Sequence, residues 1–513
     1  MSDAAASPAA GEAPQAINRP MVTVFIMLAT IMQILDTTIA NVALPSMRGS
    51  LGATQDQVTW VLTSYIVAAA IMTPVTGWLA ERFGTRELFI GSVVGFTATS
   101  MLCGMSTGLE MMVIFRILQG ICGAALVPLS QSVLLDINPR EKHGQAMAIW
   151  GAGIMIGPII GPTLGGWLTD TFNWRWVFFV NLPIGIIALI GMVLFLPKAK
   201  QRTRGFDFLG FALLALAIGS LQMLLDRGEQ VEWFASKEVW IELGLTVSGL
   251  WAFIIHAKSV EHPFLDLRIF KDRNLVIGLI MIFMIGMILL AALALLPPML
   301  QNIMGYPVVT TGFVMAPRGV GTMISMILVG RLVQRFDPRL LIFVGLSLAA
   351  LSLYQMTCFT PQMDNSLIIM SGVVQGLGLG FVMVPLSTVA FATLAPRYRT
   401  DGTSLFSLLR NIGSSVGISI VTTVLAHNLQ INHAELVERI TPFNPMVSDA
   451  AKSLGVSQET ALAVLSQEVQ RQAAMIGYID DFKLMMIITL AVIPLLLFMR
   501  KPARAGGPNV AME

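Results

Sequence analysis

Charged side chains are scarce in this sequence of 513 residues, in which Asp, Glu, Lys and Arg together make up only 12%. A soluble globular protein carries about 25% charged residues, whereas 55% of this chain is hydrophobic. The net charge is only +2, so no large excess of one sign points to a polyanionic partner. These shortages exclude a soluble enzyme, a nucleic-acid-binding protein and a disordered scaffold. They predict a polytopic membrane protein.

Cysteine and histidine are also rare, with three and five residues. Cys103, Cys122 and Cys358 lie in apolar stretches without paired spacing, and we expect small buried side chains rather than disulfides. The histidines show no metal-site grouping and the chain has no phosphate-binding loop, so we expect no metal, no cofactor and no ATP-driven step. The segment 413–417 matches the G-x-S-x-G nucleophile motif, but it lies in an apolar helical run instead of a strand–turn–helix. We therefore expect no enzyme.

Long apolar runs are what the chain has instead. A helix needs about 20 mostly apolar residues to cross a bilayer. The start, 1–20, lacks the basic segment of a signal peptide, so the first run is interpreted as a membrane helix. Fourteen runs are long enough, and they lie near 21–45, 57–80, 88–106, 109–134, 144–169, 175–196, 207–226, 238–257, 275–300, 308–331, 340–359, 366–394, 402–426 and 482–499.

The distribution of Lys and Arg between the runs predicts the orientation. With a cytoplasmic N-terminus, the inner connections hold 21 of these residues and the outer ones six. This bias predicts an even number of spans with both termini cytoplasmic. The longest connection, 427–480, is then on the outer side, and we expect its stretch 448–475 to form a short amphipathic helix pair that docks a periplasmic partner. The alternative is a surface cap without a partner.

An internal repeat divides the chain. The segment 77–86 recurs as 330–339 with five of ten positions identical at an offset of 253, and 119–120 and 127–130 recur as 375–376 and 384–387. Two parallel six-helix halves with an extra helix pair between them are a transporter architecture. The predicted organisation is a tail (1–20), a first bundle (21–200), two extra helices (201–262), a second bundle (263–499, including 427–480) and a second tail (500–513).

Five motifs follow one another along the chain: Leu35–Pro45, Gly77–Arg86, Arg116-x-x-Gln119-Gly120, Gly153–Gly166 and Trp174–Gly185. In this order they resemble the major facilitator superfamily, in its 14-helix drug:proton antiporter branch of the EmrB type. The resemblance implies an all-α fold of 14 transmembrane helices (6 + 2 + 6) in the bacterial inner membrane. It also implies proton-coupled export of hydrophobic drugs by alternating access, with a membrane fusion protein and an outer-membrane channel as partners. Glu81 departs from the usual Asp of the family's loop motif.

Charges inside the spans are the first candidates for function, because each costs about 2.5–3.5 kcal/mol on insertion scales. Asp36 can change its protonation state, whereas Arg116 stays protonated and is the natural counter-charge. In the resembling family the matching residues serve proton coupling, and the alternative is a static ion pair. Because the repeat partner of Arg116 is Gly372, this charge exists only in the first half.

Two further arginines lie inside spans. Arg410 either contacts anionic substrates or balances Asp36 in one conformation, and the alternative is that it snorkels toward the inner face. Arg318 lies between Pro317 and Gly319, and we expect a structural residue whose head group reaches water where the helix is loosened. Few other polar side chains are available for a substrate cavity, and the candidates are Gln33, Thr37, Asn41, Gln119 and Arg410.

Two motifs are candidates for conformational control. Glycines spaced by four let a neighbouring helix approach closely, and the resemblance implies an antiporter motif that closes the cavity and prevents leak, although plain helix packing explains the spacing too. Its residues are Gly153, Gly157, Pro158, Gly161, Pro162, Gly165 and Gly166. The repeated loop motif predicts a cytoplasmic gate of Gly77, Glu81, Arg82, Gly84, Arg86, Gly330, Arg335 and Arg339, against the alternative that these arginines only set the topology.

The sequence leaves the substrate open. A multidrug exporter is favoured by 32 Met and 27 Phe residues, because soft side chains repack around varied ligands. A dedicated exporter of one metabolite, such as a siderophore or a lipid, fits the same architecture. A non-transporting scaffold or sensor is less consistent with the chain, because it has no use for the buried Asp36 and Arg116.

Overall fold

A computed structural model describes residues 18–197, 205–261, 263–438, 452 and 457–499 of the protein. These residues form helices and no strand. The helices of the first half are α1 (Arg19–Leu51), α2 (Gln55–Val58), α3 (Trp60–Met72), α4 (Thr76–Phe83), α5 (Thr85–Gly104), α6 (Leu109–Gly123), α7 (Leu126–Ile137), α8 (His143–Ile154), α9 (Ile156–Thr171), α10 (Trp176–Phe179) and α11 (Asn181–Phe195). Those that follow are α12 (Phe208–Arg227), α13 (Lys237–Ser259), α14 (Arg273–Pro298), α15 (Val308–Leu332), α16 (Pro338–Met356), α17 (Asn365–Ala392), α18 (Arg399–Val437) and α20 (Gln458–Val492).

The described residues include fourteen segments that are long and apolar enough to cross a membrane, and this confirms the predicted number. Four spans of the first half consist of two helices in succession, α3–α4, α6–α7, α8–α9 and α10–α11. Between α3 and α4 a single 3₁₀ turn contains Pro74, which cannot donate a backbone hydrogen bond to a regular helix. The protein is a multi-pass, all-α membrane protein.

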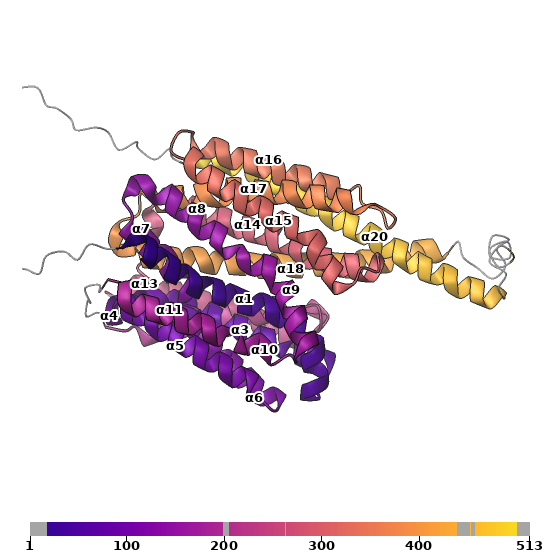
Figure 1. Ribbon diagram of the computed structural model, residues 1–513, viewed down its shortest axis with the longest axis horizontal. Helices are drawn as coiled ribbons and strands as arrows, with labels where there is room; N and C mark the ends of the chain where they lie inside the picture. The colour runs from indigo at the N-terminus through magenta and orange to yellow at the C-terminus, as the bar shows by residue number, and fades with distance from the viewer. Residues whose placement is uncertain (1–17, 198–204, 262, 439–451, 453–456, 500–513) are drawn as a thin grey trace, which may run out of the picture.

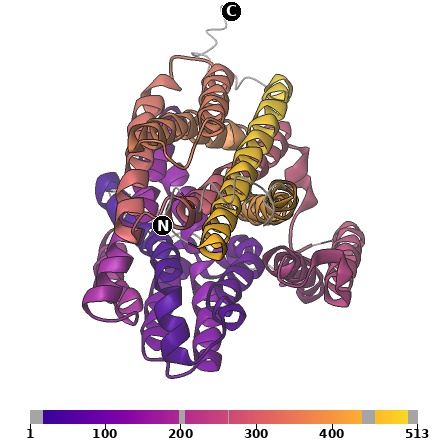
Figure 2. The same ribbon diagram turned by 90° about the vertical axis from the view of Figure 1, so that its right-hand side faces the viewer.

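The spans form two bundles with an extra helix pair at their side. Helices α1 to α11 pack mainly on one another, apart from α8, which packs mainly on α15 and α17, and helices α14 to α20 also pack mainly on one another. Figure 1 shows the first group in indigo and magenta beside the second in orange and yellow. The extra pair consists of α12, which contacts both α3 and α18, and α13, which packs mainly on α12 and stands apart from the bundles in Figure 2. We call the end of the molecule at which α1 begins the inner end and the opposite end the outer end.

The last two spans are much longer than the membrane is thick. At 1.5 Å per residue, the 39 residues of α18 and the 35 of α20 extend about 58 and 53 Å, against about 30 Å for the hydrocarbon core. Their outer parts project beyond the other helices at the right of Figure 1. The expectation of a separate helix pair in the connection 427–480 is wrong where the structure describes it, because 427–437 continue α18 and 458–480 begin α20. Of the stretch between them, 439–451 and 453–456 lie outside the described residues.

The three cysteines are free, as expected, but they differ in exposure. Cys103 is buried and Cys122 is half-buried, whereas Cys358 is exposed. The prediction of a buried side chain is therefore wrong for Cys358. It lies in the turn directly after α16, where the chain leaves the packed bundle at the outer end.

Candidate functional site

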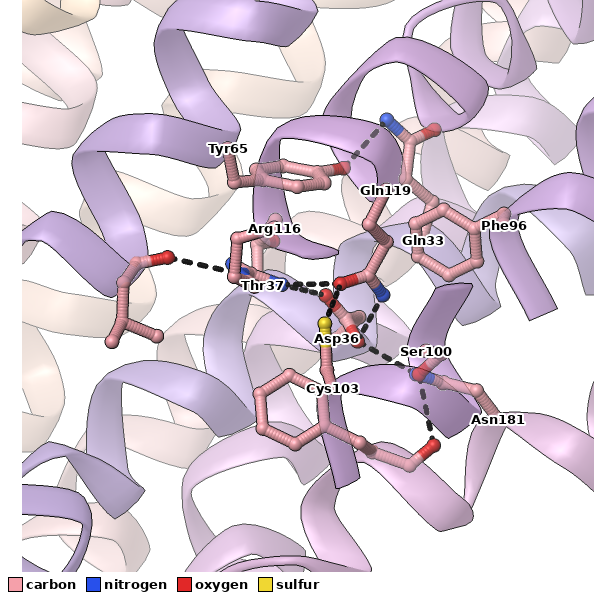
Figure 3. A network of polar contacts seen from close by, with 12 residues as sticks. Gln33, Asp36, Thr37, Tyr65, Phe96, Ser100, Cys103, Arg116, Gln119 and Asn181 are labelled. Atoms are coloured by element: carbon pink, nitrogen blue, oxygen red, sulfur yellow. Dashed lines mark hydrogen bonds and ion pairs between the residues drawn. The ribbon is translucent and has the colours of Figure 1, made fainter. Parts of the chain in front are cut away.

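The carboxylate of Asp36 lies at the centre of a buried polar network in the first bundle (Figure 3). Its Oδ2 atom accepts a hydrogen bond of 2.8 Å from Nη1 of Arg116, and the same contact is an ion pair. Its Oδ1 atom accepts hydrogen bonds from the side-chain amides of Gln119, at 3.0 Å, and Asn181, at 2.7 Å. All four residues are completely buried. The network thus joins α1, α6 and α11.

The guanidinium of Arg116 is held on several sides, which fixes its direction toward Asp36. Its Nε donates to the carbonyl oxygen of Val61 at 2.8 Å, and Nη1 also donates to Oε1 of Gln119 at 2.8 Å. The guanidinium carbon lies 4.4 Å from the ring centroid of Tyr65, within the range of a cation–π contact. Because the guanidinium is planar and has five donors, a lysine cannot reproduce this set.

Asn181 and Tyr65 were not among the residues predicted from the sequence. Asn181 also donates to the hydroxyl of Ser100 at 2.9 Å, and Gln33 donates to the hydroxyl of Tyr65 at 3.3 Å. Asn181 lies inside the segment Trp174–Gly185 that carried the resemblance, so the motif was a signal. An uncharged amide in an apolar run gave no reason to single it out.

The network has the donor pattern of an ionised acid. An ionised carboxylate only accepts hydrogen bonds, and in each of the three hydrogen bonds of Asp36 described above a donor points at one of its oxygens. Adding a proton to Asp36 removes the charge that Arg116 faces and displaces at least one donor. Proton binding at this acid is therefore coupled to the packing of α1 against α6 and α11.

The glycines of α8 and α9 pack directly against α1, the helix that carries Asp36. A Cβ atom placed on Gly157 lies 2.7 Å from Cγ2 of Ile34, and one on Gly161 lies 2.2 Å from Oγ1 of Thr38. A Cβ atom placed on Gly153 would contact Met27, and one placed on Gly165 would contact Ile39. A Cβ atom on Gly166 would have no neighbour within 4 Å. Of the two prolines of the motif, Pro158 is in the first turn of α9 and Pro162 is inside the helix. The stripe therefore sets the distance between α9 and the segment of α1 around Asp36.

The residues predicted for a substrate cavity lie in different surroundings. Gln33 and Thr37 are half-buried on α1, and Asn41 is exposed on the same helix. Gln119 is fully buried and is committed to Asp36 and Arg116 in this conformation. The structure does not bring Arg410 into the Asp36 network: it is half-buried on α18, where its backbone oxygen lies 2.4 Å from a Cβ placed on Gly286 of α14.

Arg318 occupies the repeat position of Tyr65, at the same offset of 253 residues that relates the two loop motifs. The backbone of each residue packs against the glycine of a Gln-Gly pair. A Cβ atom placed on Gly120 would lie 2.5 Å from the carbonyl oxygen of Tyr65, and one placed on Gly376 would lie 2.1 Å from the carbonyl oxygen of Arg318. The side chain of Arg318 is only 6% exposed, so the expectation that it reaches water is wrong. Helix α15 runs on through Pro317 without the opening that was expected.

The repeated loop motifs lie where the two halves meet at the inner end. A Cβ on Gly77 of α4 falls 1.6 Å from Oδ1 of Asp401 on α18, and one on Gly330 of α15 falls 2.4 Å from Cβ of Ala148 on α8. Of the remaining residues predicted for the gate, Arg82 and Arg335 are exposed, Glu81, Arg86 and Arg339 are half-buried, and Gly84 is buried with a φ of 90°. Arg86 donates to the carbonyl oxygen of Val193 at 2.6 Å, which ties it to α11 of its own half.

Hydrogen bonds join the halves at this end. Arg399 of α18 pairs with Asp136 of α7 at 2.6 Å, Thr403 donates to the oxygen of Pro128 at 3.1 Å, and the side chain of Gln334 donates to the oxygen of Glu141 at 3.2 Å. Ser132 with Thr400 and Arg399 with the oxygen of Leu135 add two further hydrogen bonds, and all of these contacts between the two bundles lie at the inner end. The inner end is therefore closed in this conformation.

Two pseudo-symmetric bundles, an internal repeat and a buried acid on the first helix form a pattern that a family comparison can test. Residues 26–418 match the family model described as Major Facilitator Superfamily. The chain belongs to the major facilitator superfamily. Membership makes it a secondary transporter rather than an enzyme, and the matched range contains the whole Asp36 network.

Curated relatives in the superfamily cover nearly the whole chain. The Multidrug export protein EmrB of Escherichia coli K12 is 36% identical over 493 residues, which are 95% of this chain and 96% of that protein. The Fatty acid resistance protein FarB of Neisseria gonorrhoeae is also 36% identical, over 95% of this chain and 97% of that protein. The human organic anion transporter MFSD10 has a similar solved structure, with a TM-score of 0.60 and 13% identity over 92% of this chain and all of that one, a likeness of fold alone.

Proposed function

We propose that this protein exports hydrophobic compounds in exchange for protons, with Asp36 as the proton carrier. The observation that carries the proposal is the completely buried pair of Asp36 and Arg116, held by two amides in a transporter of this superfamily. Membrane-embedded ionisable residues are costly and mark proton and substrate pathways in transporters. The name of the Escherichia coli relative supports a broad range of drugs as the substrates.

In the proposed cycle the described conformation is the state in which Asp36 has released its proton. Protonation weakens its attraction to Arg116 and changes the packing of α1, against which the glycine stripe of α9 lies. Opening of the inner end requires the pair of Asp136 and Arg399 to separate. Any ligand that binds one of the two states more tightly shifts the equilibrium between the inner-closed and inner-open states.

We place the inner end in the cytoplasm and the protein in the bacterial inner membrane. The excess of Lys and Arg in the connections at that end supports this orientation. No cofactor is part of the proposal, since the proton gradient supplies the driving force. The projecting parts of α18 and α20 then lie in the periplasm, where they offer a helical surface to a membrane fusion protein that leads to an outer-membrane channel.

A second candidate is a dedicated exporter of one lipid-like metabolite. The name of the Neisseria gonorrhoeae relative favours it, because that protein is equally identical to this chain and confers fatty acid resistance. Both candidates use the same proton site, so only the substrate distinguishes them.

Purified protein in proteoliposomes tests the proposal. An imposed proton gradient should drive the movement of lipophilic dyes, and an ionophore that collapses the gradient should stop it. A panel of dyes, antibiotics and fatty acids separates the candidates, because a multidrug exporter moves several unrelated compounds and a dedicated exporter moves one class. Folded protein that moves none of them, with or without the gradient, contradicts both.

A further inference from the structure

A second carboxyl group is completely buried in the half of the molecule that does not contain Asp36. Asp481 lies on α20 and is 0% exposed. Neither of its carboxyl oxygens has a hydrogen-bond partner. This contrasts with Asp36, whose oxygens accept three hydrogen bonds in the same conformation.

The surroundings of Asp481 are apolar. On its own helix it is flanked by Tyr478, Phe482 and Met485, which belong to the hydrophobic cluster at the outer end of the second bundle. The ring of Phe482 packs edge-on against that of Phe359, with centroids 6.0 Å apart. An ionised carboxylate without a partner is far more costly in such a place than a neutral carboxylic acid.

No basic group offsets this cost among the neighbours of Asp481. On α20, Lys483 pairs instead with the half-buried Asp480 at 3.0 Å. In the described part of the chain, none of the ionisable side chains on the packed helices is a hydrogen-bond partner of Asp481. Those side chains are Arg273 on α14, Arg339 and Tyr354 on α16, and Arg399, Asp401, Arg410, His427, His433 and Glu435 on α18.

Arg410 is the deep cation of this bundle, but it lies at another level. Leu425 of α18 lies beside Gly477 of α20, because a Cβ atom placed on Gly477 would lie 3.0 Å from Cδ1 of Leu425. Arg410 precedes Leu425 by 15 residues and Asp481 follows Gly477 by four, so at 1.5 Å per residue about 16 Å of helix axis separates them. The arginine therefore cannot serve Asp481 as Arg116 serves Asp36.

We propose that Asp481 is a second, reversible proton-binding site, which holds its proton in the conformation in which Asp36 has released one. The proposal rests on the proposed proton antiport and deepens it. The two acids then bind protons in different conformations, one in each half of the molecule. Repacking of α20 against α18 and α16 during the transport cycle exposes Asp481 to a polar environment, where the carboxyl group ionises.

Infrared difference spectroscopy reports directly on whether the carboxyl group of Asp481 carries a proton. A protonated carboxylic acid has a carbonyl stretching band at higher frequency than a carboxylate, and this band shifts in D₂O. The wild type at neutral pH should show the band, Asp481→Asn should lack it, and the neighbouring Asp480→Asn should retain it. Absence of the band from the wild type, or its persistence in Asp481→Asn, would overturn the proposal.

Counting protons tests reversibility. In weakly buffered detergent, a drug that shifts the conformational equilibrium should change the protonation of Asp36 and Asp481 in opposite directions, so the two changes partly cancel. The net number of protons taken up or released per drug should therefore be larger in Asp481→Asn than in the wild type or Asp480→Asn. An identical change in all three overturns the inference while the antiport stands. No change in any of the three, Asp481→Asn included, removes the proposed antiport and the inference with it. Since asparagine has nearly the size of a protonated aspartic acid, unchanged thermal unfolding of Asp481→Asn provides the check on folding.

Discussion

Asp36 and Arg116 form an ion pair of 2.8 Å in which neither side chain is exposed to any solvent. Two amides also donate hydrogen bonds to the acid, and a carbonyl oxygen and an aromatic ring also contact the arginine. Such a pair is stable only as a pair, since each charge is costly to bury without the other. A group that must gain and lose a proton in such a setting makes the packing of the bundle depend on its charge.

The first prediction is a double-mutant cycle on this pair. Arg116→Gln leaves the charge of Asp36 buried without its cation and should lower the free energy of unfolding by about 3–5 kcal/mol. Adding Asp36→Asn removes that stranded charge and should recover most of the stability, yet the double variant should not transport. Unfolding in detergent and dye transport in proteoliposomes measure the two effects. Wild-type stability of Arg116→Gln alone would count against the buried pair.

The second prediction concerns the glycine stripe. Gly161→Ala places a methyl group 2.2 Å from Oγ1 of Thr38 and should force α9 away from α1, at a cost of about 1–3 kcal/mol and with a loss of transport. Gly166→Ala is the matched control, because its methyl group meets nothing within 4 Å and alanine is the better helix former. Unfolding temperature and transport rate measure both. Equal behaviour of the two variants would show that the stripe does not set the helix distance.

The third prediction concerns the closed inner end. Asp136→Arg should break the pair with Arg399 and shift the population toward inner-open states, and the charge-reversed double variant with Arg399→Asp should restore closure. Distances between spin labels at the inner ends of the two bundles measure the shift. A double variant that stays as open as the single one would argue that this ion pair does not contribute to closure.

The fourth prediction is a pH dependence at the extra helix pair. Partial burial raises the pKa of Asp207, but hydrogen bonds from the backbone of Gly210, the ring of His256 and the backbone of Phe264 outweigh it and hold the pKa below the usual 3.8. A carboxyl group with a lowered folded-state pKa stabilises the protein above its unfolded pKa, and this stability is lost as the pH falls through the folded value. The wild type should therefore unfold at higher temperature than Asp207→Asn at neutral pH, and the difference should shrink below about pH 3.8. A difference that is constant with pH would rule out ionisation as its cause.

Much of this arrangement could be predicted from the sequence because it leaves strong local signals. Apolar runs marked the fourteen spans, and the recurrence of 77–86 at 330–339 marked the repeat. Asp36 and Arg116 stood out because a charge inside a span is rare. Asn181 and Tyr65 carry no charge, so only their position in the folded bundle reveals that they complete the site.

The outer ends of the last spans could not be predicted for a different reason. Hydropathy falls where a helix leaves the membrane, whether or not the helix ends there, so the last span was predicted to begin at 482 while α20 begins at Gln458. That boundary placed Asp481 in a connection, one residue outside the predicted span. Its burial became visible only when α16, α18 and α20 were seen packed together.

The central claim is that Asp36 carries the exchanged proton, and drug-evoked proton flux tests it most directly. Proteoliposomes with a trapped pH-sensitive dye and an imposed gradient receive a lipophilic drug, with wild-type protein or Asp36→Asn. We expect flux in the wild type and none in the variant, although the variant stays folded and still binds drug. Equal flux in both would contradict it and would assign the proton to another residue.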